Sequence, residues 1–410
     1  MADATQLDNT CFETWNYTNV TSALDNLDRI SWGGVDKLVI VFILPIISIA
    51  GILMNFAFLF TVATVPRMQM VTNFYLVNLS AADILFLMFT LGSYVHTYLH
   101  SALRNNVPYL SDFGCWGNFY PIYLSYYASV LIITLVSLER FMVICMPVKY
   151  RLIKGKARTV KWIAACWGLS LVLAALSTPR YGDLRMKCIL WPDTEAFASL
   201  PRLYRSCYLV SNAWALASEI IQTLLFLIAM FTSCITYYKL IVTLHQKMAP
   251  VGRRRSSRGD REHRNRQERN QVARLLVVNG LVFFICQFPA RVINIDKVVR
   301  AINGNLQVNF AALLGIANGC LLINSAINPI IYGLSSRMYR VAFCEAFGIA
   351  RLLKLERKPS SGSRSLSQAK SNESLDRILD SPVTKKNLTK SMETLDRDVD
   401  SPAKNNVTLN

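Results

Sequence analysis

The sequence has 410 residues, of which 52% are hydrophobic and 17% are charged, and its net charge is +18. Soluble domains carry about 25% charged residues, so this composition argues against a soluble protein and indicates an integral membrane protein. The basic residues lie between and after long apolar segments and form no compact basic domain, which argues against nucleic acid as a partner.

The first 36 residues are polar and acidic, and they lack the leading basic and apolar regions of a cleavable signal peptide. We therefore expect no cleaved leader. Two glycosylation sequons begin at Asn16 and Asn19. Both asparagines are candidate glycosylation sites, provided that this segment lies outside the cell.

A helix that spans a bilayer needs about 20 mostly apolar residues. Seven such segments follow one another along the chain. They are residues 37–66, 71–99, 114–146, 161–177, 207–244, 271–294 and 308–334. The sequence therefore predicts an all-α membrane protein in which residues 37–334 form a bundle of seven transmembrane helices.

Lysine and arginine indicate the orientation of the bundle, because cytoplasmic loops are enriched in them. They are dense after the third, fifth and seventh segments, and eight arginines lie between residues 253 and 269 alone. We therefore expect these three exits to be cytoplasmic and residues 1–36 to form an extracellular tail. The predicted location is the plasma membrane.

Two further segments follow the last span. Residues 335–348 combine apolar and basic residues as a short helix on the inner membrane surface does. Their Cys344 is either an acylation site or an ordinary interfacial thiol. Residues 349–410 contain few apolar residues and are expected to be disordered. A duplicated segment, residues 370–382 and 390–402, is either a phosphorylation-controlled docking tail or an inert duplication.

Polar side chains inside the spans need partners, because the bilayer core offers no water. Asp83 ends the run Asn-Leu-Ser-Ala-Ala-Asp, residues 78–83, in the second segment. The seventh contains Asn-Ser-Ala-Ile-Asn-Pro-Ile-Ile-Tyr, residues 324–332. The third ends in an adjacent acid and base, Glu139 and Arg140, with a proline seven residues beyond, which is typical of a cytoplasmic helix end.

These motifs resemble those of the rhodopsin-like (class A) G-protein-coupled receptors, and the resemblance extends over residues 36–347. The chain departs from the family pattern in three places. Phe141 follows Arg140 where the family has tyrosine, Gln287 stands in place of a tryptophan, and Ala229 in place of a proline. In the family, the residues at the last two positions take part in activation. The steps that depend on them are therefore the ones that the resemblance supports least for this chain.

A cation site is predicted around Asp83, because a lone carboxylate in the membrane would either be neutralised or bind a cation. Ser129, Asn324 and Asn328 supply further oxygen atoms of the kind that hard cations bind. The resemblance implies that the ion is sodium, and the sequence suggests no other cofactor.

The resemblance also implies a conformational switch that ends at Arg140, next to Glu139. Pro329 and Pro289 allow bends in the seventh and sixth segments. By resemblance, Tyr237 and Tyr332 move towards Arg140 when the cytoplasmic helix ends separate. The alternative is a structural hydrogen-bond network that does not switch.

Four cysteines lie in the segments expected outside the cell. By resemblance, Cys115 at the start of the third segment pairs with Cys188 in the second outer loop. Cys11 and Cys207 also lie outside and could pair. Four cysteines allow three connectivities, and the sequence alone does not choose among them.

Two positions exclude known classes of ligand, because each lacks the residue that the class requires. Ile122 stands where amine receptors of the family have an aspartate, and Leu322 stands where opsins have the lysine that binds retinal. The expected pocket is aromatic and hydrogen-bonding, with spare positive charge. It comprises Tyr94, Tyr98, Ile122, Tyr123, Tyr126, Gln222, Gln287, Arg291 and Asn294.

Such a pocket suits a peptide with an acidic or carbonyl-rich end, and the chain is similar to peptide receptors of the thyrotropin-releasing-hormone, neuromedin and ghrelin kind. Arg291 is the expected ligand anchor, unless it forms an ion pair with a loop acid such as Asp296. The alternatives are a lipid or other small non-amine ligand and, with less support, a transporter. No catalytic arrangement of residues is apparent, so an enzyme is not expected.

The resemblance implies several partners besides an extracellular peptide. A heterotrimeric G-protein would contact Arg140 and the basic inner loops. Receptor kinases and arrestin would bind the C-terminal tail, and membrane lipids would surround the spans.

Overall fold

The protein is described here by a computed structural model that covers residues 11–17, 19–153, 155–247, 257–303 and 311–348. The expected disorder of residues 349–410, with the duplicated segment, lies outside these described residues. All the membrane-spanning helices belong to one compact unit, Met1–Arg340, and a second unit comprises Val341–Asn410.

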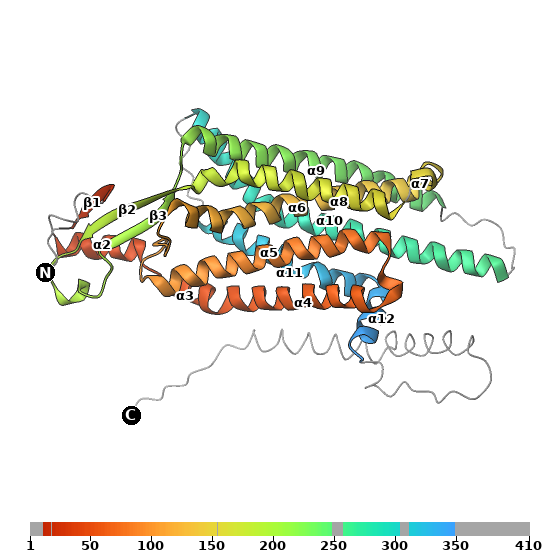
Figure 1. Ribbon diagram of the computed structural model, residues 1–410, viewed down its shortest axis with the longest axis horizontal. Helices are drawn as coiled ribbons and strands as arrows, with labels where there is room; N and C mark the ends of the chain where they lie inside the picture. Colours follow the sequence, from red (N-terminus) through yellow and green to blue (C-terminus); the bar gives the residue numbers. More distant parts are fainter. Residues whose placement is uncertain (1–10, 18, 154, 248–256, 304–310, 349–410) are drawn as a thin grey trace, which may run out of the picture. The chain divides into compact units, whose positions relative to one another are not determined.

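Seven helices of the described part of the chain are long and apolar enough to cross a membrane, which confirms the predicted bundle (Figure 1). The first span, Gly34–Thr64, comprises α3 (Gly34–Leu38), a π-helical turn (Val39–Ile43) and α4 (Leu44–Thr64). The others lie in α5 (Val71–His100), α6 (Asp112–Cys145), α8 (Lys156–Ser177), α9 (Asn212–Lys247), α10 (Ser257–Asn303) and α11 (Ala311–Ser335).

The expected bounds of several spans are corrected by the structure. The sixth helix, α10, runs from Ser257 to Asn303 and so extends beyond both ends of the expected range 271–294. The fourth helix begins at Lys156 and not at residue 161, because its polar first turn continues the helix beyond the apolar run. The fifth begins at Asn212 and not at residue 207, because Cys207 belongs to a β-strand. A short helix, α7 (Pro147–Ile153), follows the third span, and α12 (Arg337–Ala346) forms within the predicted range 335–348.

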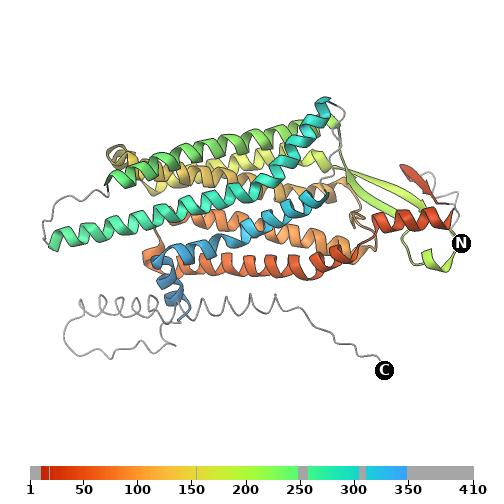
Figure 2. The same ribbon diagram turned by 180° about the vertical axis from the view of Figure 1, so that it is seen from behind.

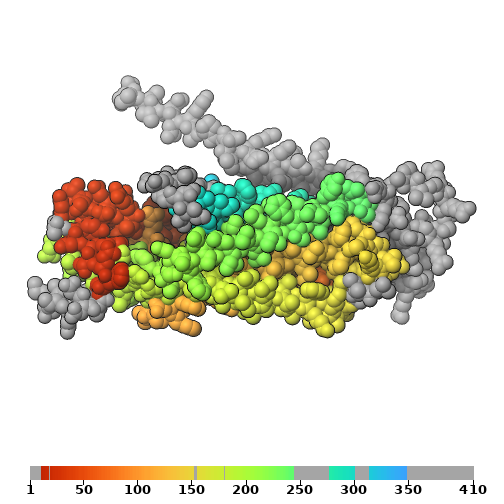
Figure 3. All heavy atoms as spheres, turned by 90° about the horizontal axis from the view of Figure 1, so that it is seen from above, coloured from red at the N-terminus to blue at the C-terminus, as the bar shows by residue number. Residues whose placement is uncertain are grey.

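Two glycines allow close contacts between helices of the bundle. A Cβ atom at Gly51 in α4 would lie 2.7 Å from Cβ of Ala326 and 2.8 Å from Cδ1 of Leu87, so a glycine is needed where α4, α5 and α11 meet. A Cβ atom at Gly280 in α10 would overlap the hydroxyl of Tyr237 in α9. Figure 2 shows the arrangement of the helices from behind, and Figure 3 shows α8 and α9 side by side on one face.

A small folded region lies beyond one end of the helices (Figure 1). Its sheet has the order β1-β2-β3, with β1 (Glu13–Asn16) parallel to β2 (Asp183–Leu190) and β2 antiparallel to β3 (Leu203–Tyr208). Helix α2 (Val20–Ile30) is capped by Asn19, whose side chain accepts a hydrogen bond from the backbone N–H of Thr21 at 3.0 Å. The segment that precedes the first span is therefore folded in its described part.

Candidate functional site

The buried polar residues of the second and seventh spans meet in the structure. Asp83 is 1% exposed, and its Oδ2 accepts a hydrogen bond of 2.6 Å from Nδ2 of Asn328. Asn55 joins the first span to the seventh, because its Nδ2 donates to the carbonyl oxygen of Ser325 at 3.0 Å. We refer to Asn55, Asp83, Asn324, Ser325 and Asn328 as the polar seam.

Several buried oxygen atoms near Asp83 have no hydrogen-bond partner among the described residues. They include Oδ1 of Asp83, Oδ1 of Asn324 and Oδ1 of Asn55. Ser129 in α6 is also buried, at 6% exposure. A buried polar atom without a partner is costly, and carboxylate and amide oxygens are the atoms that hard cations prefer. The residues present therefore fit a small cation.

Near the C-terminal end of α6, Glu139 is held by Arg158 of α8 and not by its neighbour Arg140. Nη2 of Arg158 lies 2.7 and 2.8 Å from the two carboxylate oxygens of Glu139. The guanidinium of Arg158 also lies over the ring of Tyr150, at 5.4 Å. Burial and the hydrogen bond to Glu139 raise the pKa of Tyr150 to about 12. Glu139 thus faces two partners, one from α7 and one from the start of α8.

Arg140 is 7% exposed, and its Nε and Nη2 have no hydrogen-bond partner among the described residues. The two tyrosines expected to move towards it lie on other partners. The hydroxyl of Tyr237 accepts a hydrogen bond of 2.7 Å from Ser137, and the ring of Tyr332 packs on Phe58 with 5.1 Å between centroids. The hydroxyl of Tyr332 makes no hydrogen bond to any described residue. We refer to this arrangement, in which Arg140 is buried and both tyrosines lie on other partners, as the closed arrangement.

At the outer half of the bundle, α6, α9 and α10 bring three predicted pocket residues together. Nη1 of Arg291 lies 3.4 Å from Oε1 of Gln222, and its guanidinium lies 4.7 Å from the ring centroid of Tyr126. The hydroxyl of Tyr126 donates to the backbone oxygen of Gln222 at 3.3 Å. We refer to Tyr126, Gln222 and Arg291 as the outer cluster. Gln287 and Asn294, also predicted for the pocket, are buried in α10 at 4% and 8% exposure.

Arg291 forms no ion pair with Asp296 in the structure. Asp296 instead pairs with Arg300, at 2.7 Å. Arg291 is 6% exposed, and its Nε has no hydrogen-bond partner among the described residues. A buried guanidinium with spare donors can bind a carboxylate or carbonyl group.

Two other predicted pocket residues, Tyr94 and Tyr98 of α5, contact residues outside the outer cluster. The hydroxyl of Tyr94 accepts a hydrogen bond of 3.5 Å from Asn318, and the ring of Tyr98 packs on Trp32 at 5.6 Å. Ile122 and Tyr123 are half-buried in α6. The structure therefore brings together the part of the predicted pocket on α6, α9 and α10, and places the two tyrosines of α5 in other contacts.

One charged residue near the outer cluster is missing from the predicted pocket. Glu219 in α9 is 2% exposed, and its Oε1 lies 3.4 Å from Nζ of Lys297. Its signal in the sequence is plain, because it is the single acidic residue of the apolar segment 207–244. An acid inside a span is a candidate functional residue.

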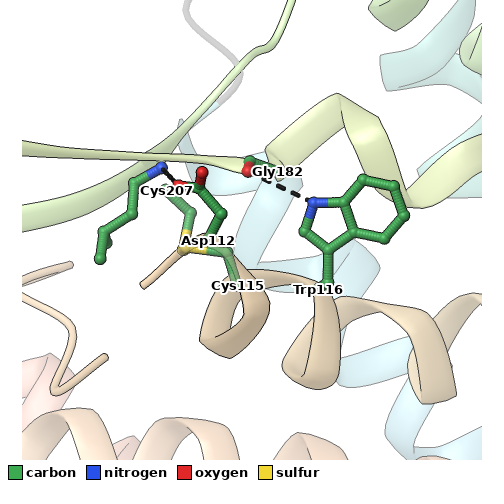
Figure 4. The surroundings of a disulfide bond; sticks show 6 residues. Asp112, Cys115, Trp116, Gly182 and Cys207 are labelled. Carbon is green, nitrogen blue, oxygen red and sulfur yellow. Dashed lines mark hydrogen bonds between the residues drawn. A yellow bond between two sulfur atoms is a disulfide. The ribbon is translucent and has the colours of Figure 1, made fainter. Parts of the chain in front are cut away.

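The expected disulfide between Cys115 and Cys188 is wrong. Cys115 at the start of α6 bonds to Cys207, as Figure 4 shows. Cys188 bonds instead to Cys11. The reason is the position of each cysteine along the hairpin. Cys207 in β3 is paired with Leu184, whose backbone N–H donates to Asp112 at 2.7 Å, so this end of the hairpin lies at the start of α6.

Cys188 lies four residues farther along β2, about 13 Å away at the usual rise of a strand. It is opposite Thr14 of β1, next to the region from which Cys11 comes. A disulfide requires Cα atoms about 6 Å apart, so Cys188 is out of reach of Cys115. The two bonds therefore fasten the hairpin to α6 and β1 to the hairpin.

An ion pair accompanies the second disulfide. Nζ of Lys187 lies 2.5 Å from Oε2 of Glu13 and 4.5 Å from the ring centroid of Trp15. The hydrogen bond from Lys187 lowers the pKa of Glu13 from its ordinary value, so the pair stabilises β1 at neutral pH and is lost as the pH falls through the lowered pKa. The sequon residues Asn16, which ends β1, and Asn19, which caps α2, are both exposed.

Comparisons with known proteins agree with this arrangement. A family model described as "7 transmembrane receptor (rhodopsin family)" matches residues 54–332. The chain is 28% identical to neuromedin-U receptor 2 of Homo sapiens, over 72% of this chain and 68% of that protein. It is 26% identical to the allatostatin-A receptor of Bombyx mori, over 81% of this chain and 84% of that protein. It is 26% identical to the substance-P receptor of Mus musculus, over 74% and 69% respectively.

Proposed function

Because the chain belongs to the rhodopsin family of seven-transmembrane receptors, we propose that it binds an extracellular peptide and in response activates a heterotrimeric G-protein. The family consists of multi-pass receptors of the plasma membrane and not of enzymes. The similar proteins named above belong to its neuropeptide branch.

The peptide proposal rests mainly on the burial of Arg291 and on its incomplete hydrogen bonding. Its guanidinium is buried against Tyr126 and Gln222, yet its Nε lacks a hydrogen-bond partner among the described residues. Charge-assisted hydrogen bonds to a carboxylate or carbonyl are strong in such surroundings. A peptide terminus or acidic side chain supplies these groups, and Glu219 with Lys297 provides a second charged pair at the same end of the helices.

The two disulfides support an orientation with the sheet and residues 1–36 outside the cell. Disulfides form and persist in oxidising surroundings, and both bonds lie in the region of β1, β2 and β3. This orientation exposes Asn16 and Asn19 to glycosylation and leaves Arg140 on the cytoplasmic side.

The polar seam, together with Ser129 of α6, is proposed to bind sodium. Asp83, Ser129, Asn324 and Asn328 would hold the ion, and the partnerless oxygens of Asp83 and Asn324 support this assignment. A cation there would stabilise the packing in which Asn328 bonds to Asp83, and so would oppose activation.

The cytoplasmic step is proposed to be the release of Arg140. In this proposal the bends at Pro289 and Pro329 let the helix ends separate, Tyr237 and Tyr332 leave Ser137 and Phe58, and Arg140 becomes available to the G-protein. The burial of Arg140 without complete hydrogen bonding supports the proposal, because a buried charge of this kind gains from a new partner. Receptor kinases and arrestin would act on residues 349–410.

The decisive experiment is a screen of a neuropeptide library on cells that express the chain, with calcium and cyclic-AMP readouts. We expect a peptide agonist whose potency falls by roughly tenfold or more in Arg291→Ala, since a charge-assisted hydrogen bond contributes about 1.5–3 kcal/mol. Arg300→Ala is the matched control, because this arginine pairs with Asp296. Equal potency of both variants at equal surface expression would remove Arg291 from the site, and activation by a lipid alone would contradict the peptide proposal.

A further inference from the structure

Glu219 of α9 is an acid buried beside the outer cluster. It is 2% exposed and precedes Gln222 by one helical turn, about 4.5 Å along the helix axis. Gln222 in turn faces Arg291, with 3.4 Å between Oε1 and Nη1. A buried acid in a membrane span is costly unless a cation or a hydrogen-bond donor faces it. The surroundings of Glu219 therefore attract positive charge, one turn away from the residue that contacts Arg291.

The lysine that faces Glu219 is loosely held. Nζ of Lys297 lies 3.4 Å from Oε1 of Glu219, whereas charge-assisted bonds of this kind are about 2.7–2.9 Å long. The side chain of Lys297 is 45% exposed, and that of Glu219 is 3% exposed. Glu139, by comparison, is held by Arg158 at 2.7 Å, and this arginine is 19% exposed. Lys297 can therefore withdraw into water at little cost, while Glu219 stays buried and binds the next cation that reaches it.

A guanidinium is better suited to Glu219 than the lysine that it would displace. It is planar, it can bind both oxygens of a carboxylate at once, and it is less strongly hydrated than an ammonium group. The exchange replaces one ion pair by another, so its main effect is selectivity and not overall affinity. A ligand without a basic group gains nothing from Glu219, because it leaves Lys297 in place.

Arg291 and Glu219 together define a ligand with two features. Nε of Arg291 has no hydrogen-bond partner among the described residues, so it can bind a carboxylate or carbonyl oxygen, while Glu219 binds a base. Because α9 begins just after β3, Glu219 lies closer than Gln222 to the end of the helices that carries the sheet. An extended peptide advances about 3.3 Å per residue, which is close to one helical turn. The base and the acceptor group therefore fit on the same residue or on neighbouring ones.

We infer, on the basis of the proposed peptide-receptor function, that Glu219 is the residue that selects the peptide. The ligand carries an arginine at or next to the end whose carboxylate or carbonyl group binds Arg291. The guanidinium of this arginine binds the carboxylate of Glu219 and displaces Lys297 into solvent. A peptide with a neutral or acidic residue at the same place leaves Glu219 paired with Lys297 and binds less tightly.

The test measures the binding of three acetylated dipeptide amides to the purified full-length receptor in nanodiscs. Acetyl-phenylalanyl-arginine amide presents the guanidinium, its citrulline analogue has the same shape without the charge, and its glutamate analogue reverses the charge. The affinity follows from the rise in melting temperature with probe concentration. We expect the arginine probe to bind roughly tenfold more tightly than the citrulline probe, and the glutamate probe to bind least. Glu219→Gln should abolish this preference, and Lys297→Gln should increase the affinity for the arginine probe about threefold.

Asp296→Asn is the matched control, because this acid of α10 pairs with Arg300 at 2.7 Å and its loss should leave the preference unchanged. Equal affinities of the arginine and citrulline probes for the wild type would overturn the inference, without any variant that could fail to fold. So would a preference that persists in Glu219→Gln.

The inference and the proposed function fail in different ways. An active peptide in the cell screen, together with equal probe affinities, would overturn the inference alone. A preference for the arginine probe without G-protein activation by any peptide would contradict the proposed function and support Glu219 as a residue that binds a cationic ligand.

Discussion

Arg158 holds both carboxylate oxygens of Glu139, while Arg140, the residue next to Glu139, keeps two guanidinium nitrogens without a hydrogen-bond partner in the described structure. The acid and the base that adjoin each other in the sequence are therefore not each other's main partners. Arg158 and Arg140 compete for one buried carboxylate, and the outcome of that competition bears on the activity of the receptor without ligand.

We expect Arg158→Ala to lower basal G-protein activation. Without Arg158, the carboxylate of Glu139 turns to Arg140 and holds it in the closed arrangement. A charge-assisted hydrogen bond contributes about 1.5 kcal/mol, so the basal rate should fall by roughly tenfold. The measurement is nucleotide exchange in membranes at matched receptor density.

Arg158→Lys keeps the charge and should stay near the wild-type rate. Glu139→Gln should raise the basal rate, because it removes the negative charge that compensates the buried Arg140. A basal rate in Arg158→Ala at or above that of the wild type would contradict the competition.

The two disulfides should behave as independent pairs. Mass spectrometry of unreduced peptides should find Cys115 linked to Cys207 and Cys11 linked to Cys188. Cys115→Ser, Cys207→Ser and the double variant should lose the same stability, about 2–5 kcal/mol, because each change removes the same bond. A Cys115–Cys188 peptide in the wild type would refute this connectivity.

Gly280→Ala should destabilise the closed arrangement. The added Cβ overlaps the hydroxyl of Tyr237 and lies 2.8 Å from its Cζ, and overpacking of this kind costs about 1–3 kcal/mol. The melting temperature of the purified receptor should fall, and Tyr237→Phe in the same chain should restore part of it. Gly319→Ala meets no atom within 4 Å, so this control should not fall. Equal melting temperatures of Gly280→Ala and Gly319→Ala would contradict this expectation, because they would mean that α9 and α10 move apart at no cost.

Sodium should weaken agonist binding in the wild type and not in Asp83→Asn. The charge of Asp83 is the main attraction for the ion, and the coupling should change agonist affinity by about fivefold or more. The measurement compares agonist affinity in sodium chloride with that in choline chloride. Asn78→Ala on the same helix should retain the response, because Asn78 bonds to Trp167 of α8. A sodium response in Asp83→Asn would place the ion elsewhere.

The helices could be predicted because hydrophobic length is a local property of the sequence. The polar seam followed from the same reasoning, since a polar residue inside a span must find a partner, and Asp83 finds Asn328. Glu219 could also be identified from the sequence, because it is the single acid of its span. Its pairing with Lys297 could not be predicted, because that contact depends on how α9 and α10 pack.

The outer region could not be predicted to the same degree. The choice among three disulfide connectivities depends on how far along the hairpin each cysteine lies, which is a consequence of the register of β2 and β3. The strand β1 is short, and its pairing with β2 joins residues far apart in the chain. Arg158 likewise lies 19 residues from Glu139, beyond a loop whose path the sequence does not determine.

The bond between Cys11 and Cys188 couples two points that are 177 residues apart in sequence. A ligand that pushes the hairpin aside must therefore carry the first strand along with it. A fluorophore attached ahead of β1 would report the movement of the second outer loop in real time, without any label near the ligand itself. A reducing agent would break the bond between Cys11 and Cys188. The fluorophore would then no longer report the movement of the loop.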